Sequence, residues 1–159
     1  MMYPIIIFFK INRNSLAMEI LIADDIEYIP RDLEVSPNGK IYITSNGEKI
    51  TDPNNPEKSK YISDDNLWIY DLNVNFIKKI KLKPWCDKII IDKKGIAYIS
   101  HIGKDYDGDY LGETLTIFDT STDEVIKTID GFNGITSMFL QDNYLFITKL
   151  KNNALQLWI

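Results

Sequence analysis

The feature that most constrains the fold is a hairpin pattern that recurs along the chain in fixed register. Residues 32–44 (DLEVSPNGKIYIT) recur as residues 88–100 (KIIIDKKGIAYIS), with an offset of 56 residues and no gap. A more divergent third copy occupies residues 136–148 (TSMFLQDNYLFIT). Asn38 and Gly39 tolerate the positive φ that a tight turn between two β-branched runs requires. Each copy therefore predicts a two-stranded antiparallel hairpin.

A second unit alternates with the first. It consists of residues 67–71 (LWIYD), a polar turn and a run of apolar and basic residues. The same unit begins again 48 residues later, with LTIFD at residues 115–119. A weaker copy opens the chain at residues 6–22, and the first strand of another closes it at residues 155–159. A helix capped by Ser15 is the alternative for the segment after that residue, because good helix formers follow it. The repeat requires a strand there, so we expect a strand.

The two units together predict a meander with a repeat of four strands. With the strands named a to d, their order is c-d, a-b-c-d, a-b-c-d, a-b-c, which makes thirteen strands. Small four-stranded sheets that stack around a channel form the blades of a β-propeller. We therefore expect an all-β fold: one domain over residues 1–159, a partial β-propeller of about three four-stranded antiparallel blades. The expected blades cover residues 1–25 (strands c and d only), 30–82, 86–131 and 135–159 (incomplete).

Composition narrows the class of function. The chain has 159 residues, 45% of them apolar, which is enough for one domain with its own core. Its 18 basic and 23 acidic residues give a net charge of −5, which disfavours binding to nucleic acid. Cys86 is the one cysteine, so it can form no disulfide within the chain and no cysteine-rich zinc site. The apolar run at residues 3–9 is too short to span a membrane and lacks the flanks of a signal peptide.

Several conspicuous side chains are expected to be structural. The nearly continuous apolar runs at residues 67–70 and 88–91 are typical of inner strands covered on both faces. Packing between sheets explains the aromatic side chains of Trp68, Tyr70, Phe118 and Trp158 without a cofactor. Charge on an outermost strand discourages pairing with another chain, which explains Lys78, Lys79 and Lys81.

The candidate binding residues gather on one predicted face. Strand direction alternates, so the long b–c connections at residues 45–66 and 101–114 emerge on the same face, and long loops on a rigid scaffold often carry binding sites. The first residues of the inner strands crowd together on that face and could contact a ligand. The alternative is that Arg31 pairs with a neighbouring carboxylate and Trp85 packs a loop. These candidate ligand-binding residues are Arg31, Asp32, Trp85 and Asp87.

A histidine and an acidic loop are two further features of this face. His101, the only histidine, ends a b strand and is the fifth candidate ligand-binding residue. As a catalytic base it would need a partner that the sequence does not supply, so a solvated or hydrogen-bonded loop histidine is the preferred interpretation. The acidic loop DYDGDYLGE supplies hard oxygen ligands suited to calcium, without the spacing of an EF-hand. A solvated acidic loop is the preferred alternative to a calcium site, and no other cofactor is expected. The ligands of that site would be Asp105, Asp107, Asp109 and Glu113.

Two segments of the chain resemble the repeat of a known family. Residues 116–129 (TIFDTSTDEVIKTI) and residues 30–44 (PRDLEVSPNGKIYIT) are similar to the two halves of the repeat in YVTN-type β-propellers. The resemblance implies a propeller of usually seven blades, often in surface or secreted proteins. Members of the family bind proteins or small molecules, and relatives hydrolyse lactones. This chain supplies only about three blades, which leaves closure of the ring to another source.

Three hypotheses follow. The first is a non-enzymatic module that binds a protein or carbohydrate through the face with the long b–c loops. The second is a hydrolase of sugar lactones on the same face. The third is a structural one, in which a homo-oligomer completes the propeller: the terminal a-b and c-d pairs of two chains combine into shared blades and close a six-bladed ring. Equally, a fragment of a longer gene product would have the same incomplete set of blades.

Overall fold

The computed structural model describes residues 6–23, 29–45, 47–52, 54–62, 64–102, 113–132, 135–151 and 154–158. Within these ranges every regular element is a β-strand, and every strand pair is antiparallel. The all-β prediction is therefore confirmed.

Four of the sheets follow one another along the chain, and we number them I to IV. Sheet I contains β1 (Ile6–Ile11) and β2 (Met18–Ala23). Sheet II contains, in order, β3 (Pro30–Val35), β4 (Lys40–Ser45), β7 (Asn66–Asp71) and β8 (Phe76–Lys81). Sheet III contains β9 (Cys86–Ile91), β10 (Ile96–His101), β11 (Glu113–Asp119) and β12 (Glu124–Phe132). Sheet IV contains β13 (Ile135–Gln141), β14 (Tyr144–Lys151) and β15 (Ala154–Trp158).

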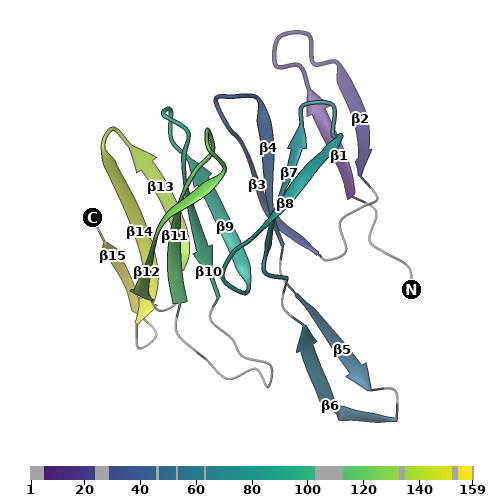
Figure 1. Cartoon of the computed structure of the whole chain (residues 1–159), viewed down its shortest axis with the longest axis vertical. Coiled ribbons are helices and arrows are strands. Elements are labelled where there is room, and N and C mark those ends of the chain that lie inside the picture. The colour runs from purple at the N-terminus through teal and green to yellow at the C-terminus, as the bar shows by residue number, and fades with distance from the viewer. Residues whose placement is uncertain are drawn as a thin grey trace.

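These thirteen strands match the predicted order of strands, and one hairpin is additional. The long connection between β4 and β7 contains β5 (Glu48–Asp52) and β6 (Asn55–Ile62), which pair only with each other. In Figure 1 this hairpin projects away from the four sheets. The segment after Ser15 forms strand β2, as the repeat required, and not the alternative helix. Asn12 ends β1, because its side-chain oxygen accepts hydrogen bonds from the backbone of Asn14 and Ser15.

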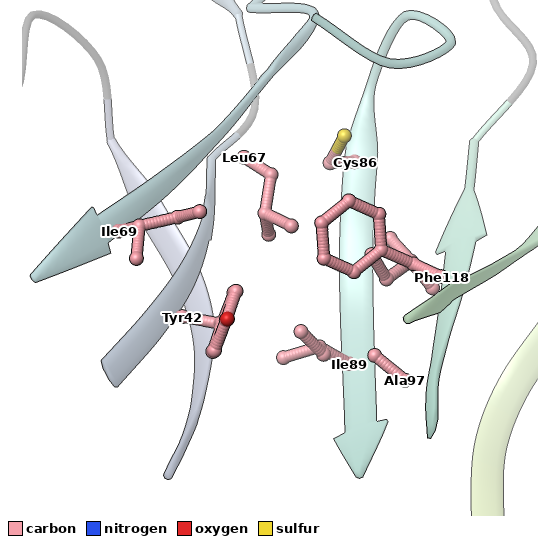
Figure 2. Close-up of a cluster of buried hydrophobic side chains, with 8 residues drawn as sticks. Tyr42, Leu67, Ile69, Cys86, Ile89, Ala97 and Phe118 are labelled. Carbon is pink, nitrogen blue, oxygen red and sulfur yellow. The ribbon is translucent and has the colours of Figure 1, made fainter. Parts of the chain in front are cut away.

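The four sheets lie side by side in chain order, with sheets I and IV at opposite ends (Figure 1). A separate apolar core fills each junction. Ala23 of sheet I packs with Ile41, Ile43, Trp68 and Tyr70 of sheet II. The core between sheets II and III joins Tyr42, Leu67 and Ile69 to Cys86, Ile89, Ala97, Ile99 and Phe118 (Figure 2). Leu115 of sheet III packs with Ile135 and Ile147 of sheet IV. Trp68, Tyr70 and Phe118 are therefore core residues, as predicted. The side chain of Trp158 is not among those that the structure describes.

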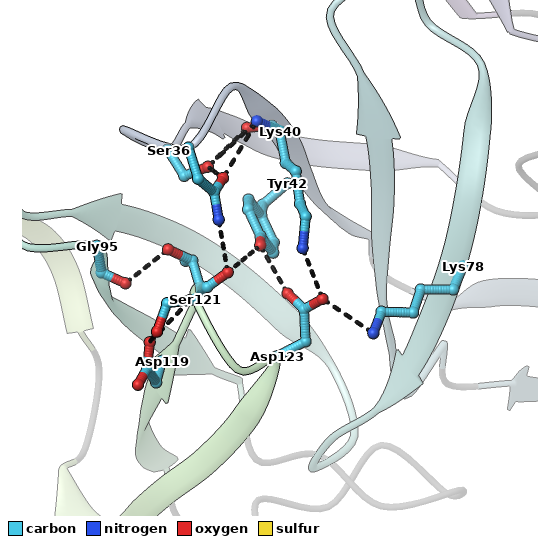
Figure 3. A network of polar contacts seen from close by, with 10 residues as sticks. Ser36, Lys40, Tyr42, Lys78, Gly95, Asp119, Ser121 and Asp123 are labelled. Atoms are coloured by element: carbon cyan, nitrogen blue, oxygen red, sulfur yellow. Dashed lines mark hydrogen bonds and ion pairs between the residues drawn. The ribbon is translucent and has the colours of Figure 1, made fainter.

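The first strands of sheets II, III and IV contact one another in turn. Strand β3 lies against β9, and β9 also contacts β13. A polar network also reinforces the junction between sheets II and III, at the edge opposite the long connection between β4 and β7 (Figure 3). The buried carboxylate of Asp123 binds Lys40 Nζ at 2.7 Å and Lys78 Nζ at 2.9 Å, and accepts a 2.7 Å hydrogen bond from the Tyr42 hydroxyl. Burial would raise the pKa of Asp123, but these hydrogen bonds outweigh it and hold the pKa below its ordinary value.

The basic residues of β8 have specific partners in addition to their edge position. Lys78 forms the ion pair with Asp123, and Lys81 Nζ lies 3.3 Å from the carboxylate of Asp65. Lys79 places its ammonium 4.9 Å from the centre of the Trp68 ring, within cation–π range. Lys79 and Lys81 therefore stabilise local contacts of sheet II, and Lys78 stabilises its junction with sheet III.

Candidate functional site

The predicted binding residues come together at one edge of sheets II and III. Arg31 and Asp32 lie at the start of β3, Asp87 near the start of β9, and His101 at the end of β10. Register explains the grouping within sheet III, because His101 pairs directly with Cys86, the residue before Asp87. The long connections leave from this same edge, as predicted.

Arg31 and Asp87 form an ion pair between the two sheets. Arg31 Nε donates to Asp87 Oδ1 at 3.0 Å, and the Arg31 side chain is 43% exposed whereas that of Asp87 is 9% exposed. The backbone carbonyl of Asp87 also accepts a 2.7 Å hydrogen bond from the hydroxyl of Thr44. Asp87 therefore holds the guanidinium of Arg31 in place, and Arg31 is the member of the pair that faces solvent.

Asp32 ties β3 to β9. Its Oδ2 accepts a 3.2 Å hydrogen bond from the backbone N–H of Ile89, and its Oδ1 accepts one of 3.1 Å from Leu33. This contact joins neighbouring inner strands that belong to different sheets. Asp32 thus has a structural role at the position where sequence reasoning placed a ligand contact.

Trp85 is buried, and its backbone contacts the end of one long connection and the start of the other. The residue is 8% exposed and has a positive φ of 61°. Its N–H donates to the carbonyl of Asp64 at 3.3 Å, and its carbonyl accepts a 2.9 Å hydrogen bond from Ile102. The arrangement agrees with the alternative interpretation, in which Trp85 packs a loop and Arg31 pairs with a carboxylate.

Asp64 is a structural residue that sequence reasoning missed. It is 1% exposed, and its carboxylate accepts hydrogen bonds from the Ser45 hydroxyl, from the Trp68 indole at 2.9 Å and from the Asn66 backbone at 3.0 Å. It therefore fixes the base of the β5–β6 hairpin to sheet II. A lone aspartate in a polar connection gives no sequence signal, because the partners come from two different strands.

His101 is buried and neutral. Only 2% of the residue is exposed, and its Nε2 lies 2.9 Å from the Thr116 hydroxyl and its Nδ1 3.7 Å from the sulfur of Cys86. Burial lowers the pKa of His101 to about 4, and hydrogen bonds to the backbone of Lys83 and Pro84 oppose that shift only in part. Burial likewise raises the pKa of the Cys86 thiol, with added repulsion from Asp64. Neither group is placed to exchange a proton with a substrate in solvent.

The acidic loop lies mostly outside the described residues. This holds for Asp105, Asp107 and Asp109, whereas Glu113 is the first residue of β11 and pairs with Phe132. Among the residues that the structure describes, no group of three histidine, cysteine, aspartate or glutamate side chains could hold a metal ion. The calcium site therefore stays a prediction.

An apolar groove of about 620 Å³ runs between β1 and β3. Sheet II contributes Leu33, Val35, Ile41 and Ile43, and β1 contributes Phe8. Leu33 and Val35 are 48% and 49% exposed. Three charged residues also belong to the lining: Arg31 and Asp32 from β3, and Lys10 from β1.

The outer face of sheet I extends this apolar surface. Alternate residues of β1 stand opposite alternate residues of β2 in register, and each of them is between 51% and 62% exposed. An apolar patch of this kind on a folded chain marks an interaction surface. Its residues are Ile7, Phe9, Ile11, Met18, Ile20 and Ile22. The strand β1 also has a free hydrogen-bonding edge within the described part of the chain, because it pairs with β2 alone.

A second, polar hollow of about 350 Å³ lies along the inner strands β3, β9 and β13. Asp32, Glu34, Lys88 and Thr136 line it. Partial burial, together with repulsion from Asp32, raises the pKa of Glu34. Two carboxylates and one ammonium group are the charged groups of this lining.

Comparisons with known proteins assign no family to this chain. No family model matches it, and no curated protein is significantly similar to it. In the described part of the chain, no helix has the length and apolarity needed to cross a bilayer.

Proposed function

We propose that this chain is a partial β-propeller that acts as a non-enzymatic interaction module and binds a protein partner through the groove between β1 and β3. The propeller part of the proposal is supported by the order of the sheets, c-d, a-b-c-d, a-b-c-d, a-b-c. It is also supported by the apolar core at each junction and by the contacts between successive first strands. Blades stacked around a channel have these properties. The resemblance to the YVTN-type repeat points the same way.

The observation that carries the binding proposal is the exposure of Leu33. Its structural equivalent in sheet III is Ile89, because Leu33 pairs with Ile43 as Ile89 pairs with Ile99. Ile89 is 4% exposed, since sheet II covers it, whereas Leu33 is 48% exposed. Among the residues that the structure describes, sheet I has two strands and covers β4 and β7 but not β3. The groove is thus the space that strands a and b of a complete sheet I would fill.

The chemistry of the groove selects the class of partner. Its aliphatic lining and the free edge of β1 suit an extended protein segment that adds to the sheet by backbone hydrogen bonds and buries alternate apolar side chains. Arg31, held by Asp87, and Lys10, paired with Glu19, are the cationic residues of the lining. Of the predicted ligand-binding residues, Arg31 therefore contacts the partner, while Asp87 orients Arg31 and Asp32 holds β3 against β9.

The surroundings of His101 favour binding over hydrolysis. A general base has to reach its substrate and have a pKa near the working pH. His101 is buried, and its pKa is lowered to about 4. The proposed module therefore uses this residue for packing beside Thr116 and Cys86.

A labelled β-hairpin peptide with alternating phenylalanine and threonine tests the groove. We expect the fluorescence anisotropy of the peptide to rise when the chain is added at nanomolar concentration. The double variant Leu33→Asp, Val35→Asp should bind the peptide at least tenfold more weakly. The matched control is Val125→Asp, Ile126→Asp on β12, where the side chains are 45% and 57% exposed outside the groove. Equal binding by the groove variant and the wild type would overturn the proposal.

A further inference from the structure

We infer that the partner in the groove is the β13–β14 hairpin of a second copy of this chain. The exchange is reciprocal, so that β14 of each copy pairs with β1 of the other. The inference rests on the proposed function and names its partner. Three independent equivalences between the sheets lead to it.

The turns that follow the third strand fix the first equivalence. Asp71 Oδ1 accepts from the backbone of Asn73 and Asn75 after β7, and Asn12 accepts in the same way from Asn14 and Ser15 after β1. Counting back from these residues makes Ile11 the equivalent of Tyr70, and Phe9 the equivalent of Trp68.

This equivalence explains the apolar outer face of sheet I. Tyr70 and Trp68 are 0% and 2% exposed because the preceding sheet covers them, whereas Ile11 and Phe9 are 55% and 60% exposed. The face that Trp68 and Tyr70 form is the best buried face of sheet II, and the equivalent face of sheet I is open. The sheet that covers this face of sheet I must therefore stand before sheet I in the stacking order.

Sheet IV has the complementary face. The cross-strand pair Glu34 and Tyr42 faces the following sheet, and Phe139 and Phe146 form the corresponding pair of sheet IV. Tyr42 is buried against sheet III, whereas Phe139 is 60% exposed. Placed in the groove, the β13–β14 hairpin would bury these two phenylalanines on Leu33 and Val35 of the other copy. Its opposite face would stay packed on its own sheet III.

The pairing register follows from sheet II. There Ile43 of β4 pairs with Trp68 of β7. Ile147 occupies the position of Ile43, because it pairs with Met138 as Ile43 pairs with Leu33. Ile147 of one copy therefore pairs with Phe9 of the other, and Phe146 pairs with Lys10. Strand β1 takes the place that β15 holds in the single chain, where Ile147 pairs with Trp158.

Two copies joined in this way form a closed, symmetric assembly. Each copy contributes two complete blades, sheets II and III. Each shared blade combines β13 and β14 of one copy with β1 and β2 of the other, so the ring has six blades. Both joints are identical by the two-fold axis, as expected for a reciprocal exchange.

Cysteine cross-linking tests the register directly. The variant Lys10→Cys, Phe146→Cys is expected to form a covalent dimer under mild oxidation, seen as a doubled mass on a non-reducing gel. The matched control is Lys10→Cys, Tyr144→Cys, which moves the second cysteine two residues along the same face of β14 and should cross-link at least tenfold less. Native Cys86 is fully buried in both variants.

Light scattering on the unmodified chain provides the second measurement. We expect twice the mass of one chain, and at least a 100-fold weaker association in the variant Leu33→Asp, Val35→Asp, because a carboxylate in an apolar contact is strongly unfavourable. A monomer at high micromolar concentration would overturn the inference. A monomer that still binds the hairpin peptide leaves the proposed function standing, whereas a monomer that does not bind it overturns both. Equal cross-linking in the two cysteine pairs would overturn the proposed register.

Discussion

At the residue scale, His101 shows how burial turns a conspicuous side chain into a structural one. Sequence reasoning preferred a solvated or hydrogen-bonded loop histidine; the contacts with Thr116 and Cys86 agree with the hydrogen-bonded option, whereas the residue is buried at the end of β10 and not solvated. The depth of burial could not be predicted, because the shielding groups come from β9, β10 and β11 together.

The low pKa of His101 makes stability depend on pH. Between about pH 6.5 and about pH 4 the unfolded chain binds a proton at this residue and the folded chain does not, so the free energy of unfolding should fall as the pH falls. The full loss is about 3 kcal/mol. Urea unfolding across this range measures it, and the variant His101→Gln should lack this part of the dependence. Because the chain has one histidine, NMR can follow its ring directly; titration near pH 6.5 in the folded chain would contradict the account.

Two turn glycines that look alike in sequence differ in their surroundings. Gly39 and Gly95 both have positive φ, 79° and 86°, as the repeated turn predicted. A Cβ at Gly95 would lie 2.8 Å from the Thr120 hydroxyl, whereas the nearest atom at Gly39 is a Leu72 methyl at 3.7 Å. Sequence reasoning treated the two positions alike because the neighbour that distinguishes them, Thr120, follows a different strand.

Alanine substitution should separate the two glycines. Gly39→Ala adds backbone strain alone and should lower the free energy of unfolding by about 1 kcal/mol. Gly95→Ala adds a clash with Thr120 and should lower it by about 1–3 kcal/mol more. Thermal and urea unfolding of the two variants provide the comparison, and equal losses would show that the Thr120 contact is not tight.

At the scale of elements, the repeated hairpins were predictable and the inserted one was not. Apolar alternation with turn residues marks β3–β4 and β9–β10, but β5 and β6 are rich in charged residues and their apolar periodicity is weak. The third hairpin differs in detail. Leu140 pairs with Leu145 where Val35 pairs with Ile41, so its turn is one residue shorter.

The β5–β6 hairpin should be dispensable for folding. Replacing residues 48–63 with a three-residue glycine-serine linker keeps Ser45 and Asp64 and is expected to change the free energy of unfolding by less than about 1 kcal/mol. In the complete chain, Asp64→Ala should cost about 3 kcal/mol, because it leaves the buried Trp68 indole without its carboxylate partner. Unfolding curves monitored by tryptophan fluorescence compare the two. A large loss in the linker variant would show that the hairpin supports sheet II.

At the scale of the whole molecule, the order of the sheets followed from the sequence, but their open surfaces did not. The offsets of 56 and 48 residues fix which strands are equivalent, and equivalence predicts the stacking order. The groove lies beside β1, where the described part of the chain places no further strand, so Leu33 and Val35 have the exposure of surface residues in a core position. The terminal segments look like ordinary members of the repeat, and only the packing reveals which of their faces lack a neighbour.

A crystal structure of the full chain tests the central claim, that equivalent sheets stack through their first strands. We expect it to show β3, β9 and β13 side by side, with the ring of Tyr42 against Phe118 across the junction of sheets II and III. Hydrogen bonding of the β3–β4 and β9–β10 hairpins into one continuous sheet, with Tyr42 and Phe118 apart, would contradict it.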